Sequence, residues 1–358
     1  MLFLLKKIFP QLFISIILED KKNIVKASIY RGNKLISSNE KTFDKSENLL
    51  EYIKNLSKHF LFYHTALFLD AKEQGLIPST NIQDCEHFNI GKISLQHILL
   101  NNALVYTATE HVEYYSELFE EYRGLDFLYS PFALLYYNMQ KEKQPDDQIL
   151  LYGFKQGYLL AIIVAKGNTI LYGDFKIFEQ ELGLELELPS EDNQEIENNN
   201  DDTEVTLDNF NEALNNKFDL LDQENNLETE DNQEIENNND DTEVTLDNFN
   251  EALNNKFDLL DQENNLETLD NNDNFNLDEL NQFSNDMELC RYIITSIEKF
   301  YNDDKYAGVF INGILLYSES DININAIDFL ESETFLEIKT KQINTLDLMI
   351  ELMRKEVK

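Results

Sequence analysis

The side chains that most often carry catalysis or metal binding are few in this chain and far apart. Its five histidines all fall in the first third of the sequence: His59, His64, His87, His97 and His111. Cys85-Glu86-His87 is the nearest approach to a metal-binding group, but it has no third ligand at a suitable spacing, so we interpret it as a surface loop. The motifs GxSxG, GxxxxGKS/T and HExxH do not occur. The sequence therefore predicts no catalytic residue and no metal site.

Acidic residues are abundant, but their setting argues against catalysis. Of the 68 Asp and Glu, 35 lie in residues 181–290, which hold only 2 Lys and Arg. A catalytic carboxylate pair needs a rigid, desolvated setting. A segment with so much like charge cannot bury enough apolar surface to become ordered, so we expect it to be largely disordered. The stretch 270–280 lacks the glycine and the final glutamate of an EF-hand loop, which leaves at most weak calcium binding.

The acidic segment contains a tandem repeat, identical at residues 191–229 and 230–268. Each copy places apolar residues at helical steps of three and four, beginning with Leu207, Phe210 and Leu214 in the first copy. We favour a recent duplication in a solvated loop. The alternative is a pair of acidic amphipathic helices that bind a partner, with two copies raising the avidity.

Three features bear on location and on partners. The two cysteines, Cys85 and Cys290, form no disulfide framework, as is typical of a reducing compartment. The apolar and basic lead 1–11, MLFLLKKIFPQ, lacks the features of an export signal, so we expect a first strand soon after Pro10. No apolar run approaches the roughly 20 residues that span a bilayer. The regions that flank the acidic segment are close to neutral and lack a basic stripe, which argues against nucleic acid as a partner.

The clearest structural signal is a β-meander that occurs twice. Residues 149–178 read as three β-branched and aromatic strands joined by two short turns, and residues 12–43 repeat the pattern with turns at 20–22 and 31–33. After the first meander we expect a helix near 46–60 capped by Ser46, a strand at 64–70, a short helix at 93–100 and a strand at 103–109. A helix at 111–124, a short strand and an apolar helix near 131–139 follow.

After the acidic segment, the pattern predicts a helix at 286–303, a strand at 306–312, a helix near 323–330, a strand near 334–340 and a final helix at 343–357. The first half, as far as residue 124, and the second half therefore each spell βββαβαβα, and a further strand and helix follow in the first half. We predict an α/β, bilobal fold: a first lobe at 1–140, a second, discontinuous lobe at 149–180 plus 287–358, and an acidic, Asn-rich insertion at 181–286.

This duplicated pattern with an insertion in the second half resembles the actin-like ATPase superfamily, and within it the pilus-assembly protein PilM and the cytoplasmic domain of general secretion pathway protein L. The segments that carry the resemblance are MLFLLKKIFPQ, RYIITSIEKFYNDDKYAGVFING and SESDININAIDFLESETFLEIK. The resemblance covers roughly 250 residues outside the insertion and implies an actin-like fold.

In that superfamily, turns that carry Asp and Gly hold the metal-bound phosphates of ATP. Here the first turn contains Glu19 and Asp20 but no glycine, and the second contains Gly153 and Gly157 but no carboxylate. The third contains the single Gly313. Side chains in such turns block the close backbone approach that phosphate requires. The resemblance with these departures implies a degenerate nucleotide site, with neither ATP nor Mg²⁺ as a cofactor.

The resemblance further implies a non-catalytic scaffold in a type IV pilus, type II secretion or DNA-uptake apparatus at the inner membrane. Its expected partners are the cytoplasmic tail of a membrane assembly protein and the assembly ATPase, and it is expected to be cytoplasmic and to meet the membrane only through partners. Two alternatives stay open: an active ATPase or kinase with atypical loops, and an adaptor that acts through the acidic repeats. The sequence decides neither which apparatus is involved nor whether the chain self-associates.

Overall fold

The computed structural model describes residues 8–19, 22–44, 48–91, 94–120, 124–142, 147–178, 277–306 and 308–357. Residues 1–182 and 275–358 form one compact unit, and residues 183–274 are a second unit that contains both repeat copies and lies outside the described residues. The expected disorder and helices of the acidic repeat thus fall outside the part of the chain that the structure describes.

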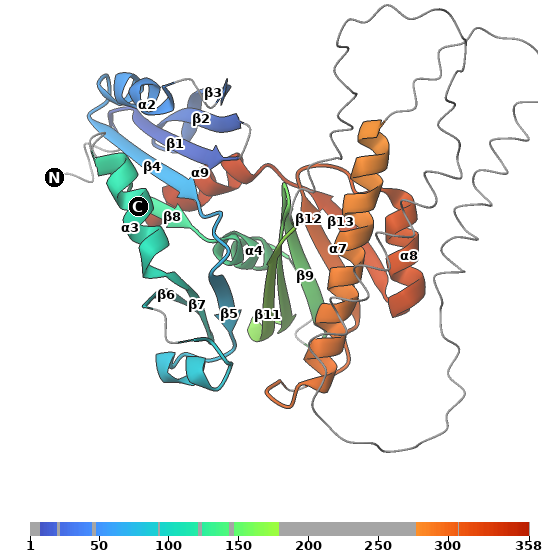
Figure 1. Cartoon of the computed structure of the whole chain (residues 1–358). Helices are drawn as coiled ribbons and strands as arrows, with labels where there is room; N and C mark the ends of the chain where they lie inside the picture. The colour runs from blue at the N-terminus through green and yellow to red at the C-terminus, as the bar shows by residue number, and fades with distance from the viewer. Residues whose placement is uncertain are drawn as a thin grey trace, which may run out of the picture. The chain divides into compact units, whose positions relative to one another are not determined.

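Two five-stranded sheets of the same topology form the framework (Figure 1). The first sheet has the order β3-β2-β1-β4-β8 and the second has the order β11-β10-β9-β12-β13. In each sheet the three meander strands are antiparallel and the two later strands are parallel to the first meander strand. The strands of the first sheet are β1 (Gln11–Leu18), β2 (Lys22–Arg31), β3 (Lys34–Asp44), β4 (Phe62–Phe68) and β8 (Phe127–Tyr129). Those of the second are β9 (Ile149–Gln156), β10 (Leu159–Lys166), β11 (Thr169–Ile177), β12 (Gly313–Ser318) and β13 (Glu337–Gln342).

The helices complete a βββαβαβα pattern in both halves, but in the first half the pattern ends with the helix at 131–139, and not with the predicted helix at 111–124. The first half contributes α2 (Leu49–Ser57), α3 (Thr109–Glu120) and α4 (Pro131–Met139), and the second contributes α7 (Leu277–Asn302), α8 (Ile324–Thr334) and α9 (Thr345–Glu356). The cap of α2 is Asn48, whose side chain accepts a hydrogen bond from the Glu51 N–H at 2.9 Å; the expected cap, Ser46, lies outside the described residues.

Both meanders are confirmed, and their tight turns rely on glycine. Gly32 joins β2 to β3 at φ +58°, and Gly157 and Gly167 make the two turns of the second meander at φ +56° and +54°. A side chain at any of these positions would strain the backbone, because non-glycine residues rarely adopt a left-handed conformation.

Two sequence assignments were wrong. The stretch predicted as a helix at 93–100 contains β6 (Leu95–Leu100), which pairs with β7 (Ala103–Ala108) through an Asn101-Asn102 turn in which Asn101 has φ +54°. With β5 (Gln74–Ile77) these strands form a separate three-stranded sheet inserted between β4 and α3, next to a 3-10 helix (Ile82–Glu86). A short apolar run does not reveal by its periodicity whether it is helix or strand.

The second error concerns the strand predicted at 306–312. The strand is β12, which starts at Gly313 and is buried along its whole length between β9 and β13. The described residues before it include Phe310, which is 72% exposed, so the buried apolar run ILLY, rather than GVFI, occupies the centre of the sheet. The helix before it also starts earlier than predicted, at Leu277 instead of Asp286.

The two halves exchange their last helices. Helix α4, at the end of the first half, packs on β9 and β10 of the second sheet, whereas α9, at the end of the second half, packs on β1, β2 and β4 of the first (Figure 1). One continuous core results, with Phe13 and Phe68 from the first sheet, Phe154 from the second and Met349 from α9. A second core between the first sheet, α2 and α3 contains Ile14, Ile53 and Phe119.

Candidate functional site

Polar side chains lie where parallel strands of both sheets end. Glu19 follows β1, Asp70 lies two residues beyond β4, Gln156 ends β9 and Glu319 follows β12. Ligands of open α/β sheets bind outside the carboxyl ends of parallel strands, so this edge is the candidate nucleotide site of the fold. We call these four residues the carboxyl-edge cluster.

The acidic members of the cluster are close enough to influence one another. Burial raises the pKa of Glu19 above its ordinary value, Lys22 opposes the rise, and the negative charges of Glu319 and Asp70 add to it. The Lys22 ammonium lies 3.8 Å from the Glu19 carboxylate, in a partly exposed ion pair. Within the described residues, no group of three or more His, Cys, Asp or Glu is arranged to hold a metal ion.

On the second sheet, hydrogen bonds within the chain satisfy the polar groups of the cluster. One carboxylate oxygen of Glu319 accepts the backbone N–H of Thr345 at 2.8 Å, and the other accepts the Gln156 amide at 3.1 Å. The Thr345 hydroxyl donates to Oε1 of the Gln156 side-chain amide, and both residues are buried. The Gln342 amide and the Ile343 N–H bind the carbonyl oxygens of Glu319 and Ser318. These polar groups and the first turn of α9 therefore occupy the edge where a phosphate would need free donors.

The structure separates the residues that the sequence assigned to the nucleotide turns. Glu19 and Gly157 lie at the carboxyl edges of the sheets, whereas Gly153 lies inside β9 and Gly313 begins β12 at the opposite edge. A Cβ atom on Gly153 would lie 2.6 Å from Leu316, so this glycine permits close packing of β9 and β12. Asp20 lies outside the described residues.

Sequence reasoning missed Asp70, Gln156, Glu319 and Thr345. The first three come at or just after the end of a buried apolar strand, in the stretches ALFLD, LLYGFKQ and ILLYSE. This position is a signal that could have identified them, because the ends of parallel strands meet at one edge. Thr345 gave no such signal, since its role depends on a helix that crosses to the other sheet.

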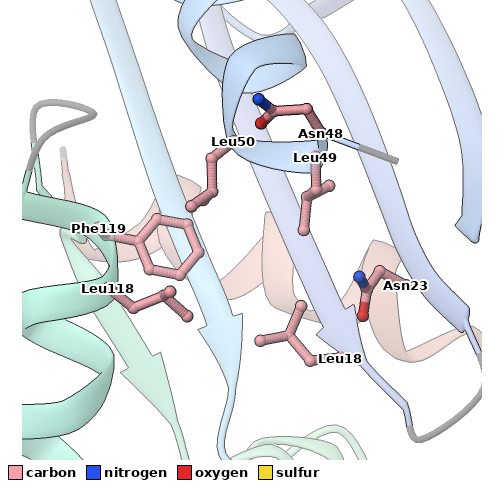
Figure 2. A pocket seen from close by; sticks show the side chains of 7 residues that line it. All are labelled: Leu18, Asn23, Asn48, Leu49, Leu50, Leu118 and Phe119. Atoms are coloured by element: carbon pink, nitrogen blue, oxygen red, sulfur yellow. The ribbon is translucent and has the colours of Figure 1, made fainter. Parts of the chain in front are cut away.

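A separate cavity lies in the first half of the chain, between the start of α2 and the end of α3 (Figure 2). Its volume is about 220 Å³, and seven residues line it: Leu18, Asn23, Asn48, Leu49, Leu50, Leu118 and Phe119. Beside it lies a second, polar hollow along α2, lined by Glu51, Lys54, Asn55 and Lys58, which shares Asn48 with the first. We call the first the α2–α3 pocket and the second the lysine hollow.

The fold is that of the actin-like ATPases, with duplicated βββαβαβα halves, equal sheet order and exchanged last helices. The sequence model of the family described as Domain of unknown function (DUF8341) matches residues 151–255 and 221–358. These two overlapping matches span more than half of the chain, so the chain belongs to this family. Residues 9–136 match another, described as Domain of unknown function (DUF8569).

Similar solved structures include a Bacteroides thetaiotaomicron protein with actin-like ATPase fold and unknown function, at 11% identity and TM-score 0.47 over 98% of both chains. A PilM–PilN type IV pilus biogenesis complex has 11% identity and TM-score 0.47 over 94% of this chain and 89% of that one. Component A of (R)-2-hydroxyglutaryl-CoA dehydratase from Acidaminococcus fermentans has 9% identity and TM-score 0.36 over 98% and 100%. No curated protein matches the sequence. Among the described helices, none has the length and apolar character to span a membrane.

Proposed function

We propose that this chain is a non-catalytic actin-like scaffold that has lost nucleotide chemistry. The observation that supports the proposal is the network of Glu319, Gln156 and Thr345 at the carboxyl edge of the second sheet. Phosphate binding needs free backbone N–H groups that glycine-rich turns bring close to the ligand. Here the Thr345 N–H already binds Glu319, and a carboxylate beside it repels a phosphate.

We further propose that the scaffold serves a type IV pilus, type II secretion or DNA-uptake apparatus at the inner membrane. In this role it binds the cytoplasmic tail of a membrane assembly protein and connects it to the assembly ATPase, and it stays on the cytoplasmic side. The support for this part is the sequence pattern that resembles the pilus-assembly and secretion proteins. A short peptide partner suits the fold, since exposed strand edges and helix-lined pockets can bind peptides.

A nucleotide titration tests the scaffold proposal. A ligand that binds only the folded state raises its stability by mass action. We expect millimolar Mg-ATP or Mg-ADP to leave the thermal unfolding midpoint of the full chain unchanged, and calorimetry to show no binding heat. An ATP-binding protein of the same fold, in the same buffer, provides the positive control. A Mg²⁺-dependent increase in the midpoint would contradict the proposal and favour an active ATPase.

The adaptor alternative has its own test. If the acidic repeats carry the function, removing residues 191–268 should abolish binding to the partner of the full chain. The scaffold proposal predicts instead that partner binding is retained, because the described residues outside the repeat build both sheets and both cores.

A further inference from the structure

The α2–α3 pocket has the size of a site for one or two side chains. Its volume of about 220 Å³ is below the roughly 300–1,000 Å³ of pockets that enclose whole small molecules. Leucine and phenylalanine side chains from β1, α2 and α3 form most of the wall, and Figure 2 shows Leu50, Leu118 and Phe119 on one side, with Leu18, Leu49 and Asn23 on the other. Such a wall favours an aliphatic or aromatic side chain.

Two residues of this wall are polar, Asn23 and Asn48, and Asn23 is the buried one. Asn23 is only 9% exposed, and its Oδ1 atom has no hydrogen-bond partner among the described residues. By strand alternation, Asn23 occupies the face of β2 that carries the buried Val25 and Ala27, where an apolar residue would normally stand. An unsatisfied buried acceptor destabilises the folded protein, because it has lost its hydrogen bond to water without gaining another. The pocket therefore presents an acceptor that a bound donor would satisfy.

The first turn of α2 adds donors at the same place. The N–H groups at the start of a helix have no partner within the helix, and the Asn48 side chain binds the N–H of Glu51, the third residue of α2. The positive end of the helix dipole favours an acceptor here. A peptide group carries both an N–H donor and a C=O acceptor, so a peptide backbone complements Asn23 and the helix start together.

The lysine hollow carries a net positive charge, because its two lysines outnumber its one carboxylate, Glu51. Lys54 and Lys58 line it beside Glu51 and Asn55, and it meets the α2–α3 pocket at Asn48. The hollow is therefore suited to a carboxylate placed a few residues from the apolar side chain.

We propose that the α2–α3 pocket binds a short peptide of a partner protein. The peptide inserts one Leu, Ile or Phe side chain between α2 and α3, donates a backbone N–H to Asn23 and places an Asp or Glu on Lys54 and Lys58. This inference deepens the proposed function, because it rests on the chain acting by peptide binding and names the peptide chemistry; it does not depend on the nucleotide site.

Selection from a phage-displayed library of random 12-residue peptides on the full chain tests this proposal. We expect the enriched peptides to share an aliphatic or aromatic residue followed within a few positions by Asp or Glu. The same selection on Leu118→Trp, which fills the pocket, should not enrich this motif. Leu35→Trp, which places the same side chain on the exposed β3, is the matched control and should enrich it.

Binding of one synthetic consensus peptide, measured by fluorescence anisotropy, assigns the contacts. We expect the Kd to rise about ten-fold for Asn23→Leu, since one buried hydrogen bond is lost. Asn39→Leu on the exposed face of β3 should bind like the unmodified chain. Replacing the apolar anchor of the peptide by alanine should weaken binding on the unmodified protein, which requires no variant to fold.

The inference is overturned if no such motif is enriched over the Leu118→Trp selection, or if pocket and control variants bind the consensus peptide equally. The Mg-ATP titration is read separately. Nucleotide binding together with pocket-dependent peptide binding would remove the non-catalytic proposal and keep this inference. If the chain binds no nucleotide and peptide binding does not depend on the pocket, this inference is overturned and the non-catalytic proposal stands.

Discussion

The carboxylate of Glu319, directly after β12, accepts the backbone N–H of Thr345, the first residue of α9, over 2.8 Å. This contact links the end of the second sheet to a helix that packs on the first sheet. It also stabilises the start of α9, since a carboxylate near a helix N-terminus satisfies an orphan N–H and interacts favourably with the helix dipole.

Replacing Glu319 by alanine should therefore lower the free energy of unfolding by about 1–3 kcal/mol, because Thr345 N–H and the Gln156 amide both lose their acceptor. Urea unfolding followed by circular dichroism gives the measurement. Glu337→Ala is the matched control, because the Glu337 side chain is exposed on β13 and forms an ion pair with the exposed Lys339 at 3.0 Å. Equal losses for the two variants would contradict a structural role for the Glu319 contact.

Replacing the buried Asp286 should lower the free energy of unfolding more than replacing Glu319. Its side chain is fully buried; one carboxylate oxygen lies 2.5 Å from the Lys155 ammonium and the other accepts the Asn323 N–H at 2.9 Å. Asp286→Ala would leave Lys155 as a buried charge, so we expect a loss of about 3–5 kcal/mol in the free energy of unfolding. Adding Lys155→Met should recover part of it.

The exposed pair of Lys176 and Glu288, at 3.3 Å, offers the comparison for Asp286. Glu288→Ala should cost less than about 1 kcal/mol, since solvent screens an exposed ion pair. A similar loss for Glu288→Ala and Asp286→Ala in urea unfolding would show that burial does not decide the effect.

Gly153 should behave as a packing glycine. A Cβ atom there would lie 2.6 Å from the Leu316 side chain, and overpacking of this kind costs about 1–3 kcal/mol. We expect Gly153→Ala to lower the unfolding midpoint in urea, and Leu316→Ala to relieve the clash in the double variant. A double-mutant cycle measures this coupling. Additive losses would show that Gly153 is needed for a reason other than the contact with Leu316.

Because of Glu19, the free energy of unfolding should decrease as the pH rises. Burial raises its pKa in the folded protein, with Glu319 and Asp70 adding to the rise. The folded state then binds a proton more tightly than the unfolded state, so this contribution to stability is present in acid and is lost as the pH rises through the folded pKa.

We therefore expect Glu19→Gln to gain stability relative to the unmodified chain between about pH 4 and pH 7. Urea unfolding over this range measures the difference. Glu319→Gln should reduce the dependence, since one of the charges that raise the pKa is removed. If the stability advantage of Glu19→Gln over the unmodified chain became smaller with increasing pH, the raised pKa of Glu19 would be contradicted.

The local part of the fold was predictable from the sequence. Both meanders follow from alternating β-branched residues and from turns at Gly32, Gly157 and Gly167, where neighbouring residues alone determine the backbone. The assignment of 93–100 was wrong because Asn101-Asn102 is a weaker turn signal than glycine, so an edge strand was mistaken for a helix.

The candidate sites were less predictable because they are assembled from distant residues. Glu319, Gln156 and Thr345 meet only after β9 and β12 pair and α9 crosses to the first sheet. The α2–α3 pocket likewise needs Asn23 and Phe119 to come together. The resemblance to the actin-like superfamily assigned Gly153 and Gly313 to turns, and pairing within the sheet places both glycines in strands.

The exchange of α4 and α9 has a consequence for synthesis of the chain. Met349 and Met353 cover the inner face of β1 and β4, yet they are translated long after these strands. A growing chain thus presents Phe13 and Phe68 to water, or to a chaperone, until α9 has been translated. The first sheet cannot complete this core before α9 has been made, and two fragments divided between α4 and β9 would each lack the helix that covers this face of its sheet.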